Sequence, residues 1–159
     1  MYTKKFIFIF SFLLLNYLYS AEIVTQTNSR VTYNDFTFTD NSKYIIITQE
    51  GQWTDNIGNY GAQECKGLIK RNDNNIIDFL DVICQLTNQN NEVTWRKFER
   101  TGSEIERGVG ISTIIDSTSK HKKELVGTKC NYAVNRTKDM VFSKSVCKIS
   151  DELYKKLTQ

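Results

Sequence analysis

Two cysteine pairs, each placed almost symmetrically about a polar turn, constrain the fold more than any other feature of this sequence. The first pair lies in Glu64–Leu86, where two strand-like runs flank four polar turn formers at 72–75. This pattern predicts a β-hairpin. If Cys65 faces Cys84, most of the apolar side chains share the face of the cysteines. The same register makes three further pairs: Gly67 with Val82, Ile69 with Leu80, and Arg71 with Asp78.

The second pair, Cys130 and Cys147, is arranged in the same way about the segment Asn-Arg-Thr-Lys-Asp at 135–139. Four cysteines in a small exported chain suggest two disulfides. Three connectivities exist, and the two local pairs are favoured over the crossed ones because each is nearly symmetric about its own turn. Each bridge would contribute about 3 kcal/mol to stability. Zinc is not expected, because the chain has no Cys-x-x-Cys motif and one histidine.

The first twenty residues have the three-part layout of a secretory signal peptide. Two lysines lie in Met1–Lys5, an apolar run follows at Phe6–Leu15, and Asn16–Ser20 is more polar. We expect cleavage after Ser20 or Ala21, with retention as an N-terminal anchor as the alternative. The apolar run is shorter than the roughly 20 residues that span a membrane. The sequence thus predicts a signal peptide at 1–20, one domain at 21–159, and a periplasmic or secreted protein without a membrane span after cleavage.

Charge gives no general reason to expect nucleic-acid binding. The chain has a formal net charge of +3, and two of its lysines lie in the predicted signal peptide, so the domain is nearly neutral. Basic and aromatic residues alternate at 95–100, which could form a stacking platform for bases. Ordinary in–out alternation of a strand is favoured, with Trp95 on one face and Arg96 and Phe98 on the other.

Short β-rich runs separated by polar turns predict an all-β fold. We count about eight strands and prefer a small antiparallel barrel to a sandwich, because closure removes exposed strand edges. Glu22–Asn28 is expected to be a loose lead-in, and Leu125–Val134 a strand of the last hairpin. Ser150 begins a short C-terminal helical segment, with acids early and lysines late.

A loop rich in glycine and asparagine suggests a ligand site. The segment 51–67 brings together one tryptophan, one tyrosine and several polar groups, which could bind a small molecule or sugar at the mouth of a barrel. The alternative is that the tryptophan fills the core and the glycines serve tight turns. The candidate ligand-binding residues are Trp53, Asp55, Tyr60 and Glu64.

The histidine, His121, lies in a basic run, Lys120-His-Lys-Lys123. A proton-transfer role is conceivable for it. A solvated loop tip is favoured, because the sequence places no serine or cysteine to act with the imidazole. The lysines could contact anionic polysaccharide or lipid head groups.

The segment 108–132 resembles a pattern of allene-oxide-cyclase-like and dirigent-like barrels. In that pattern a strand leads to a Gly-Thr-Gly-x-Tyr-like turn, a short run, Leu/Ile-x-Gly and the next strand. Leu125-Val-Gly127 matches, whereas Ser117-Thr-Ser119 replaces the glycine-rich turn and His121 the aromatic residue. The matching motif, and with it the resemblance, covers about 20 residues. It implies an eight-stranded barrel with a central cavity and transfers no catalytic residue.

These observations favour an exported, non-enzymatic β-barrel that binds a small apolar or amphipathic ligand or a partner in the cell envelope. The alternatives are a cavity-type isomerase or cyclase and an interaction module without a cavity. No cofactor is indicated, and the sequence does not specify the oligomeric state. Small, mixed-polar residues at inward positions would favour a cavity. A titratable group inside that cavity would favour an enzyme, and the residues to check are Asp55, Glu64 and His121.

Overall fold

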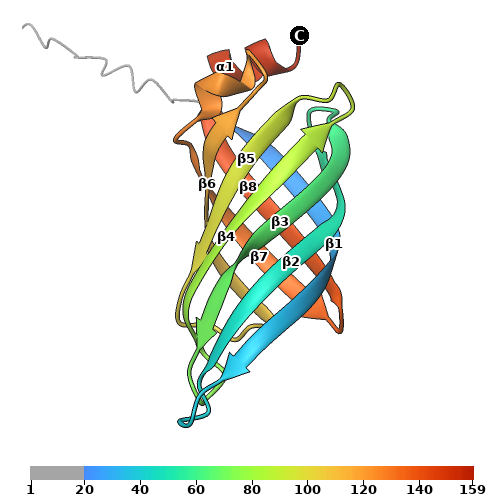
Figure 1. Cartoon of the computed structure of the whole chain (residues 1–159). Coiled ribbons are helices and arrows are strands. Elements are labelled where there is room, and N and C mark those ends of the chain that lie inside the picture. Colours follow the sequence, from blue (N-terminus) through green and yellow to red (C-terminus); the bar gives the residue numbers. More distant parts are fainter. Residues whose placement is uncertain (1–19) are drawn as a thin grey trace, which may run out of the picture.

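The computed structural model describes residues 20–159, which form a closed barrel of eight antiparallel strands (Figure 1). Each strand pairs with its neighbours in the chain, and β1 closes the barrel against β8. The all-β barrel is therefore confirmed over the sandwich. The strands are β1 (Ser20–Thr37), β2 (Lys43–Asp55), β3 (Tyr60–Arg71), β4 (Ile77–Asn88), β5 (Val93–Arg100), β6 (Arg107–Ser117), β7 (Lys129–Thr137) and β8 (Met140–Ser150).

The two ends of the barrel differ. One end, here called the helix end, carries the short helix α1 (Asp151–Leu157) and a 3-10 turn, η1 (Lys122–Leu125), in the loop between β6 and β7 (Figure 1). The opposite end carries the turns at 38–42, 72–76 and 138–139 and the loop at 101–106. The predicted signal peptide, apart from Ser20, lies outside the described residues.

Both predicted hairpins and both local disulfides are confirmed. Cys65 pairs with Cys84 between β3 and β4, and Cys130 pairs with Cys147 between β7 and β8. All four cysteines are buried inside the barrel. The predicted pairing of Arg71 with Asp78 is wrong, because a register shift between Lys70 and Arg71 places Arg71 opposite Ile77. Such a bulge adds a residue to one strand and breaks the simple numbering of the pairs.

Two predicted segment types are wrong. Glu22–Asn28 is not a loose lead-in but part of β1, where it pairs with β8 and in part with β2. Its polar outer residues belong to a strand because closure of the barrel supplies partners that its own sequence does not reveal. Leu125 is not in a strand but in η1, where its buried side chain joins an apolar cluster with Ile114.

Inward-facing positions divide into apolar clusters and a layer of small and polar residues. The larger cluster includes Ile47, Ile69 and Val82, and the smaller one lies at the helix end. Buried polar side chains lie on the same inner face: Thr25, Ser29, Gln63, Ser112 and Ser145. Gly51 also belongs to this face, and a Cβ there would collide with the carbonyl oxygen of Asn28 on β1. Small side chains therefore let neighbouring strands approach closely and leave the interior incompletely filled.

The predicted C-terminal helix is confirmed as α1. The Ser150 Oγ accepts a hydrogen bond from the Leu153 backbone N at 3.3 Å, as expected of an N-cap. Leu153, Tyr154 and Leu157 pack against the smaller apolar cluster, so α1 covers part of the helix end. No helix in residues 20–159 is long and apolar enough to cross a membrane.

Candidate functional site

A cavity of about 70 Å³ lies inside the barrel toward the opposite end. The inner faces of β2, β3 and β4 give it an apolar wall that includes Ile47, Ile69 and Val82. A small number of polar groups interrupts this wall, as in many ligand pockets. The polar or aromatic residues that line the cavity are Tyr33, Gln49, Gln63, Phe98, Arg100, Tyr132, Arg136 and Ser143.

Arg100, the last residue of β5, is the most unusual member of this lining. Its side chain points inward and the residue is 5% exposed. One guanidinium nitrogen, Nη2, donates to the Ile105 carbonyl oxygen at 3.3 Å. The other two nitrogens, Nε and Nη1, are buried without a hydrogen-bond partner. Burial lowers the pKa of Arg100, and the neighbouring Tyr132 and Glu106 partly oppose this shift. A buried cation with free donors is costly unless a ligand or water satisfies it.

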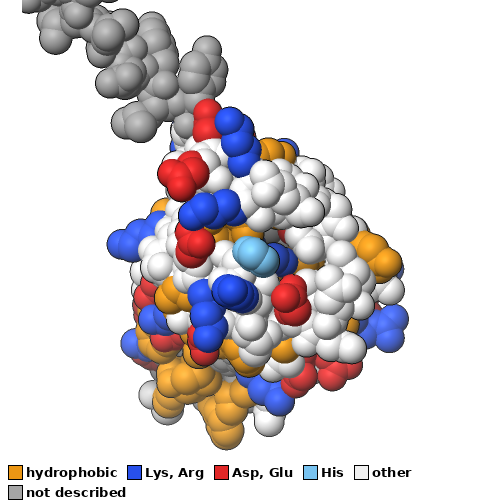
Figure 2. All heavy atoms as spheres, turned by 90° about the horizontal axis from the view of Figure 1, so that it is seen from above, with side chains coloured by type: hydrophobic (Ala, Val, Ile, Leu, Met, Phe, Trp, Pro, Cys, Tyr) orange, Lys and Arg blue, Asp and Glu red, His pale blue; other side chains and the backbone are white. Residues whose placement is uncertain are grey.

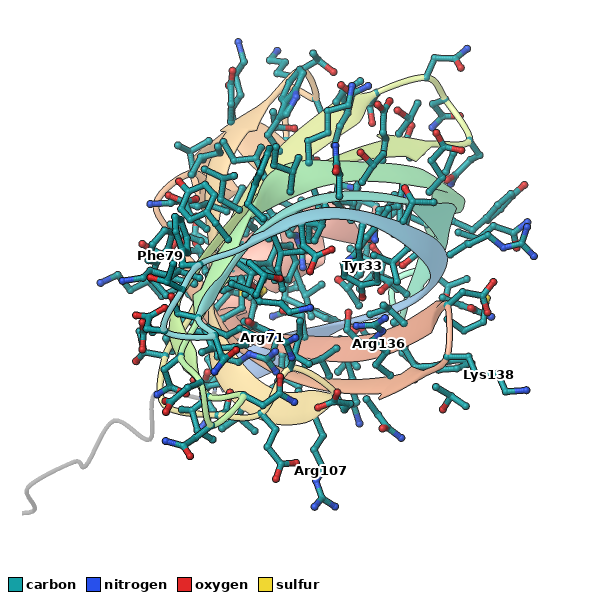
Figure 3. All side chains as sticks on the ribbon, turned by 60° about the horizontal axis from the view of Figure 1, so that its bottom comes forward. Tyr33, Arg71, Phe79, Arg107, Arg136 and Lys138 are labelled. Carbon is teal, nitrogen blue, oxygen red and sulfur yellow. A yellow bond between two sulfur atoms is a disulfide. The ribbon has the colours of Figure 1, made fainter. Side chains whose placement is uncertain are left out.

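Tyr33 and Arg136 lie at the mouth of the cavity. The Arg136 guanidinium lies 4.0 Å from the centroid of the Tyr33 ring, which is cation–π geometry, and its Nε donates to the Lys138 carbonyl oxygen at 2.9 Å. Burial raises the pKa of Tyr33 to about 12, while the positive charge of Arg136 lowers it and the negative charge of Glu106 raises it to smaller extents. The two side chains lie close together at the opening of the barrel, whereas Arg107 and Lys138 point away from it (Figure 3).

The loop at 101–106 covers one side of the mouth. Glu104 forms a bridge with Ile76, and the backbone N of Ile77 donates to Ser103 at 2.9 Å. These contacts place Ile105, which is 8% exposed, against the cavity. Beyond the mouth lies a surface hollow of about 260 Å³, and Tyr33, Ile105 and Arg136 line both spaces. These three side chains therefore lie between the cavity and the surface hollow.

Two aromatic side chains from β5 and β7 support the floor of the site. The rings of Phe98 and Tyr132 pack edge to face with their centroids 5.1 Å apart. Burial raises the pKa of Tyr132, and the nearby Arg100 lowers it to a smaller extent. Like an ordinary tyrosine it is protonated at neutral pH, and it is able to donate a hydrogen bond.

The four candidate ligand-binding residues do not form one site. Trp53 is buried and Asp55 lies at the end of β2, and both line a second, smaller pocket at the helix end. The Trp53 Nε1 donates to the Thr87 carbonyl oxygen at 3.2 Å. Tyr60 is 59% exposed, and Glu64 is exposed and forms an ion pair with Lys66 at 2.9 Å. Whether any of the four binds a ligand stays a prediction.

His121 lies at the surface of the helix end, among charged side chains of both signs (Figure 2). It lines a wide polar hollow of about 560 Å³ together with Lys120 and Lys122, and it does not reach the barrel interior. Among residues 20–159, no group of histidine, cysteine, aspartate and glutamate side chains could hold a metal ion.

The sequence patterns did not indicate that Arg100, Tyr33 and Arg136 belong to a ligand site. A signal was available for Arg100, because Arg96, Phe98 and Arg100 alternate with the outward residues of one strand and therefore share its inner face. Tyr33 and Arg136 come from β1 and β7, which are not neighbours in the sheet. No local pattern could have brought these two residues together.

Comparisons with protein-family models, with curated proteins and with solved structures find no match for this chain. The resemblance to allene-oxide-cyclase-like and dirigent-like barrels therefore stays a prediction, and the function has to be argued from the cavity.

Proposed function

We propose that this protein is an exported binding barrel that holds a small amphipathic carboxylic acid in its internal cavity. The acid would place its carboxylate at Arg100 and its hydrocarbon part against the apolar wall of β2, β3 and β4. Tyr33 and Arg136 form the passage through which the ligand would enter and leave.

The observation that carries this proposal is the buried, incompletely satisfied guanidinium of Arg100. The residue is 5% exposed, its Nε and Nη1 atoms have no partner, and it lines the cavity. A carboxylate would supply both the missing acceptors and the opposite charge. The neighbouring phenol of Tyr132, whose pKa is raised further above neutral pH by burial, offers a further donor.

The size and lining of the cavity define the rest of the ligand. A cavity of about 150 Å³ accepts benzene, so 70 Å³ suits a short hydrocarbon chain better than an aromatic ring. A longer chain would extend through the mouth toward the surface hollow of about 260 Å³. Because the cavity is small and a longer chain would extend through its mouth, we expect linear acids of about four to eight carbon atoms to fit best.

The lining favours binding over catalysis. Within residues 20–159, the cavity is lined by neither a carboxylate nor an imidazole, the usual general bases. Asp55, Glu64 and His121, the residues that an acid–base mechanism would have used, lie elsewhere. The two tyrosines that line the cavity, Tyr33 and Tyr132, have raised pKa values, so they are protonated at neutral pH and cannot act as bases there. Two disulfides support export, because such bonds persist in oxidising compartments.

Isothermal titration calorimetry of the oxidised protein with butanoate, hexanoate and octanoate, each compared with the alcohol of the same length, tests this function. We expect saturable binding of at least one acid, with the matched alcohol bound about tenfold more weakly, because it lacks the charge-assisted hydrogen bonds. Arg100→Met should weaken acid binding by about tenfold or more and leave alcohol binding nearly unchanged.

Arg107→Met is the matched control, because Arg107 is an exposed arginine that points away from the mouth. Arg100→Lys serves as a second variant if Arg100→Met does not fold. Equal affinity for acids and alcohols would contradict the role of Arg100, and the absence of any binding to the wild-type barrel would overturn the proposed function.

A further inference from the structure

A second buried arginine, Arg96, lies in a separate small pocket toward the helix end. Its side chain points inward from β5 and the residue is 6% exposed. Its Nε atom is buried without a hydrogen-bond partner. The ion pairs found within residues 20–159 do not include Arg96. The pocket has a volume of about 20 Å³, and its lining includes Trp53, Thr94 and Ile114.

Lys122 brings a second positive charge to the same pocket. It lies in η1, its Nζ is 5.3 Å from the centroid of the Trp53 ring, and it lines the pocket together with Arg96. Burial lowers the pKa of Lys122, and the positive charge of Arg96 lowers it further. Burial also lowers the pKa of Arg96, to about 10. Burial is the main cause of both pKa shifts, and the negative charge of Asp55 opposes both.

The two carboxylates that act on these cations accept hydrogen bonds from other groups, and one of them, Asp55, belongs to the lining of the pocket. Asp55 lies at the pocket and attracts both cations, yet its oxygens accept hydrogen bonds from the backbone N of Ile57 at 3.1 Å and from the backbone and side-chain amides of Asn59 at 2.8 Å. Glu92, the other acid that acts on Lys122, accepts from the Asn88 side chain at 2.8 Å. Neither carboxylate forms an ion pair with either cation.

We infer that Arg96 and Lys122 bind a single small inorganic anion, of the size of chloride, in this pocket. A volume of about 20 Å³ holds one water-sized group, because a water molecule needs about 10–15 Å³. It is too small for the acid proposed for the larger cavity. The anion would satisfy the free donor of Arg96 and reduce the repulsion between the two cations.

The inner pocket and a surface hollow at the helix end share one lining residue. Lys122 lines both the inner pocket and the polar surface hollow of about 560 Å³ around His121. Lysine and arginine side chains are prominent on this face of the molecule (Figure 2). Lys122 therefore borders both the surface hollow and the pocket that contains Arg96.

Two measurements test the site. Crystals grown in bromide should show an anomalous scattering peak within contact distance of Arg96 and Lys122. In solution, the Tm of the wild-type protein should rise when chloride replaces gluconate at constant ionic strength, because the anion binds the folded state alone. Arg96→Met and Lys122→Met should each abolish that rise.

Lys123→Met is the matched control for Lys122→Met, because Lys123 is the exposed neighbour in the same turn. Arg107→Met is the control for Arg96→Met, because it removes an exposed arginine that points away from the barrel interior, and it should keep the chloride response. Crystals with a water alone beside Arg96, or a chloride response equal in wild type and Arg96→Met, would overturn the inference. Neither result depends on acid binding in the larger cavity.

Discussion

Arg96 and Arg100 show that the position of a residue along a strand decides whether its side chain lies inside the barrel or at the surface. Both point inward from β5, both have a buried Nε without a partner, and they line different pockets. Lys97, between them in the chain, points outward and forms ion pairs with Asp81 and Glu99 at 3.3 and 2.9 Å. The period of two therefore converts neighbouring basic residues into two buried cations and one ordinary surface charge.

Tyr33 makes stability depend on pH at the alkaline end. Its pKa is about 12 in the folded barrel against 10.0 in the unfolded chain, so between these values the folded state holds a proton that the unfolded state has lost. The stability due to Tyr33 is complete below pH 10 and is lost as the pH rises toward 12. Spectrophotometric titration of the tyrosines should show a component near pH 12 that Tyr33→Phe removes.

Tyr60→Phe is the control for this titration, because Tyr60 is 59% exposed and lies outside the barrel interior. It should leave the component near pH 12 in place. Persistence of that full component in Tyr33→Phe would show that Tyr33 is not held neutral at the mouth.

Two disulfides join neighbouring strands of the barrel covalently. Each disulfide joins two adjacent strands across a short hairpin, with sequence separations of 19 and 17 residues. Replacing Cys65 and Cys84 together by alanine should lower the free energy of unfolding by about 3 kcal/mol, because the unfolded chain regains the entropy of an open loop. Urea unfolding, followed by far-ultraviolet circular dichroism, measures the loss.

The second bridge provides an internal comparison for this prediction. Cys130→Ala with Cys147→Ala should cost a similar amount, because the loop is of similar length and its cysteines are equally buried. A reducing agent should destabilise the wild-type protein and leave a variant without any cysteine unaffected. Unchanged stability of fully reduced wild type would contradict a stabilising role for the bridges.

Closure of the barrel depends on one seam between the two ends of the described chain. β1 pairs with β8 over Ser20–Arg30, and neither disulfide crosses this seam. Contacts between residues this far apart in the chain make folding slow. We expect the oxidised protein to refold in milliseconds to seconds, the range of non-local β-folds. Stopped-flow fluorescence of buried Trp53 and half-buried Trp95 measures this rate.

A substitution in β1 tests how much the ladders on either side of this strand contribute to stability. Asn28→Pro removes a ladder hydrogen-bond donor from β1, which lies between β2 and β8, and should lower stability by about 3 kcal/mol or more. Proline in place of Asp73, at the second position of an exposed turn, is the comparison outside the ladder. Refolding in microseconds, or equal effects of the two substitutions, would contradict this view of closure.

The sequence by itself determined the local structure of this protein. Alternation within strands, polar turns and the symmetry of two cysteine pairs predicted the all-β class, both hairpins, both disulfides and the helix after Ser150. The same alternation predicted that Trp95 and Arg96 lie on opposite faces. These features depend on neighbours within a single turn or hairpin, so the chain carries their signal in short segments.

Tertiary structure alone decided the rest. Glu22–Asn28 is a strand because β8 pairs with it, and Tyr33 meets Arg136 because the barrel closes. Alternation states which residues share a face, but it does not state which face becomes the interior or how completely side chains fill it. The two cavities, and with them the roles of Arg96 and Arg100, depend on the summed volume of inward side chains from all eight strands.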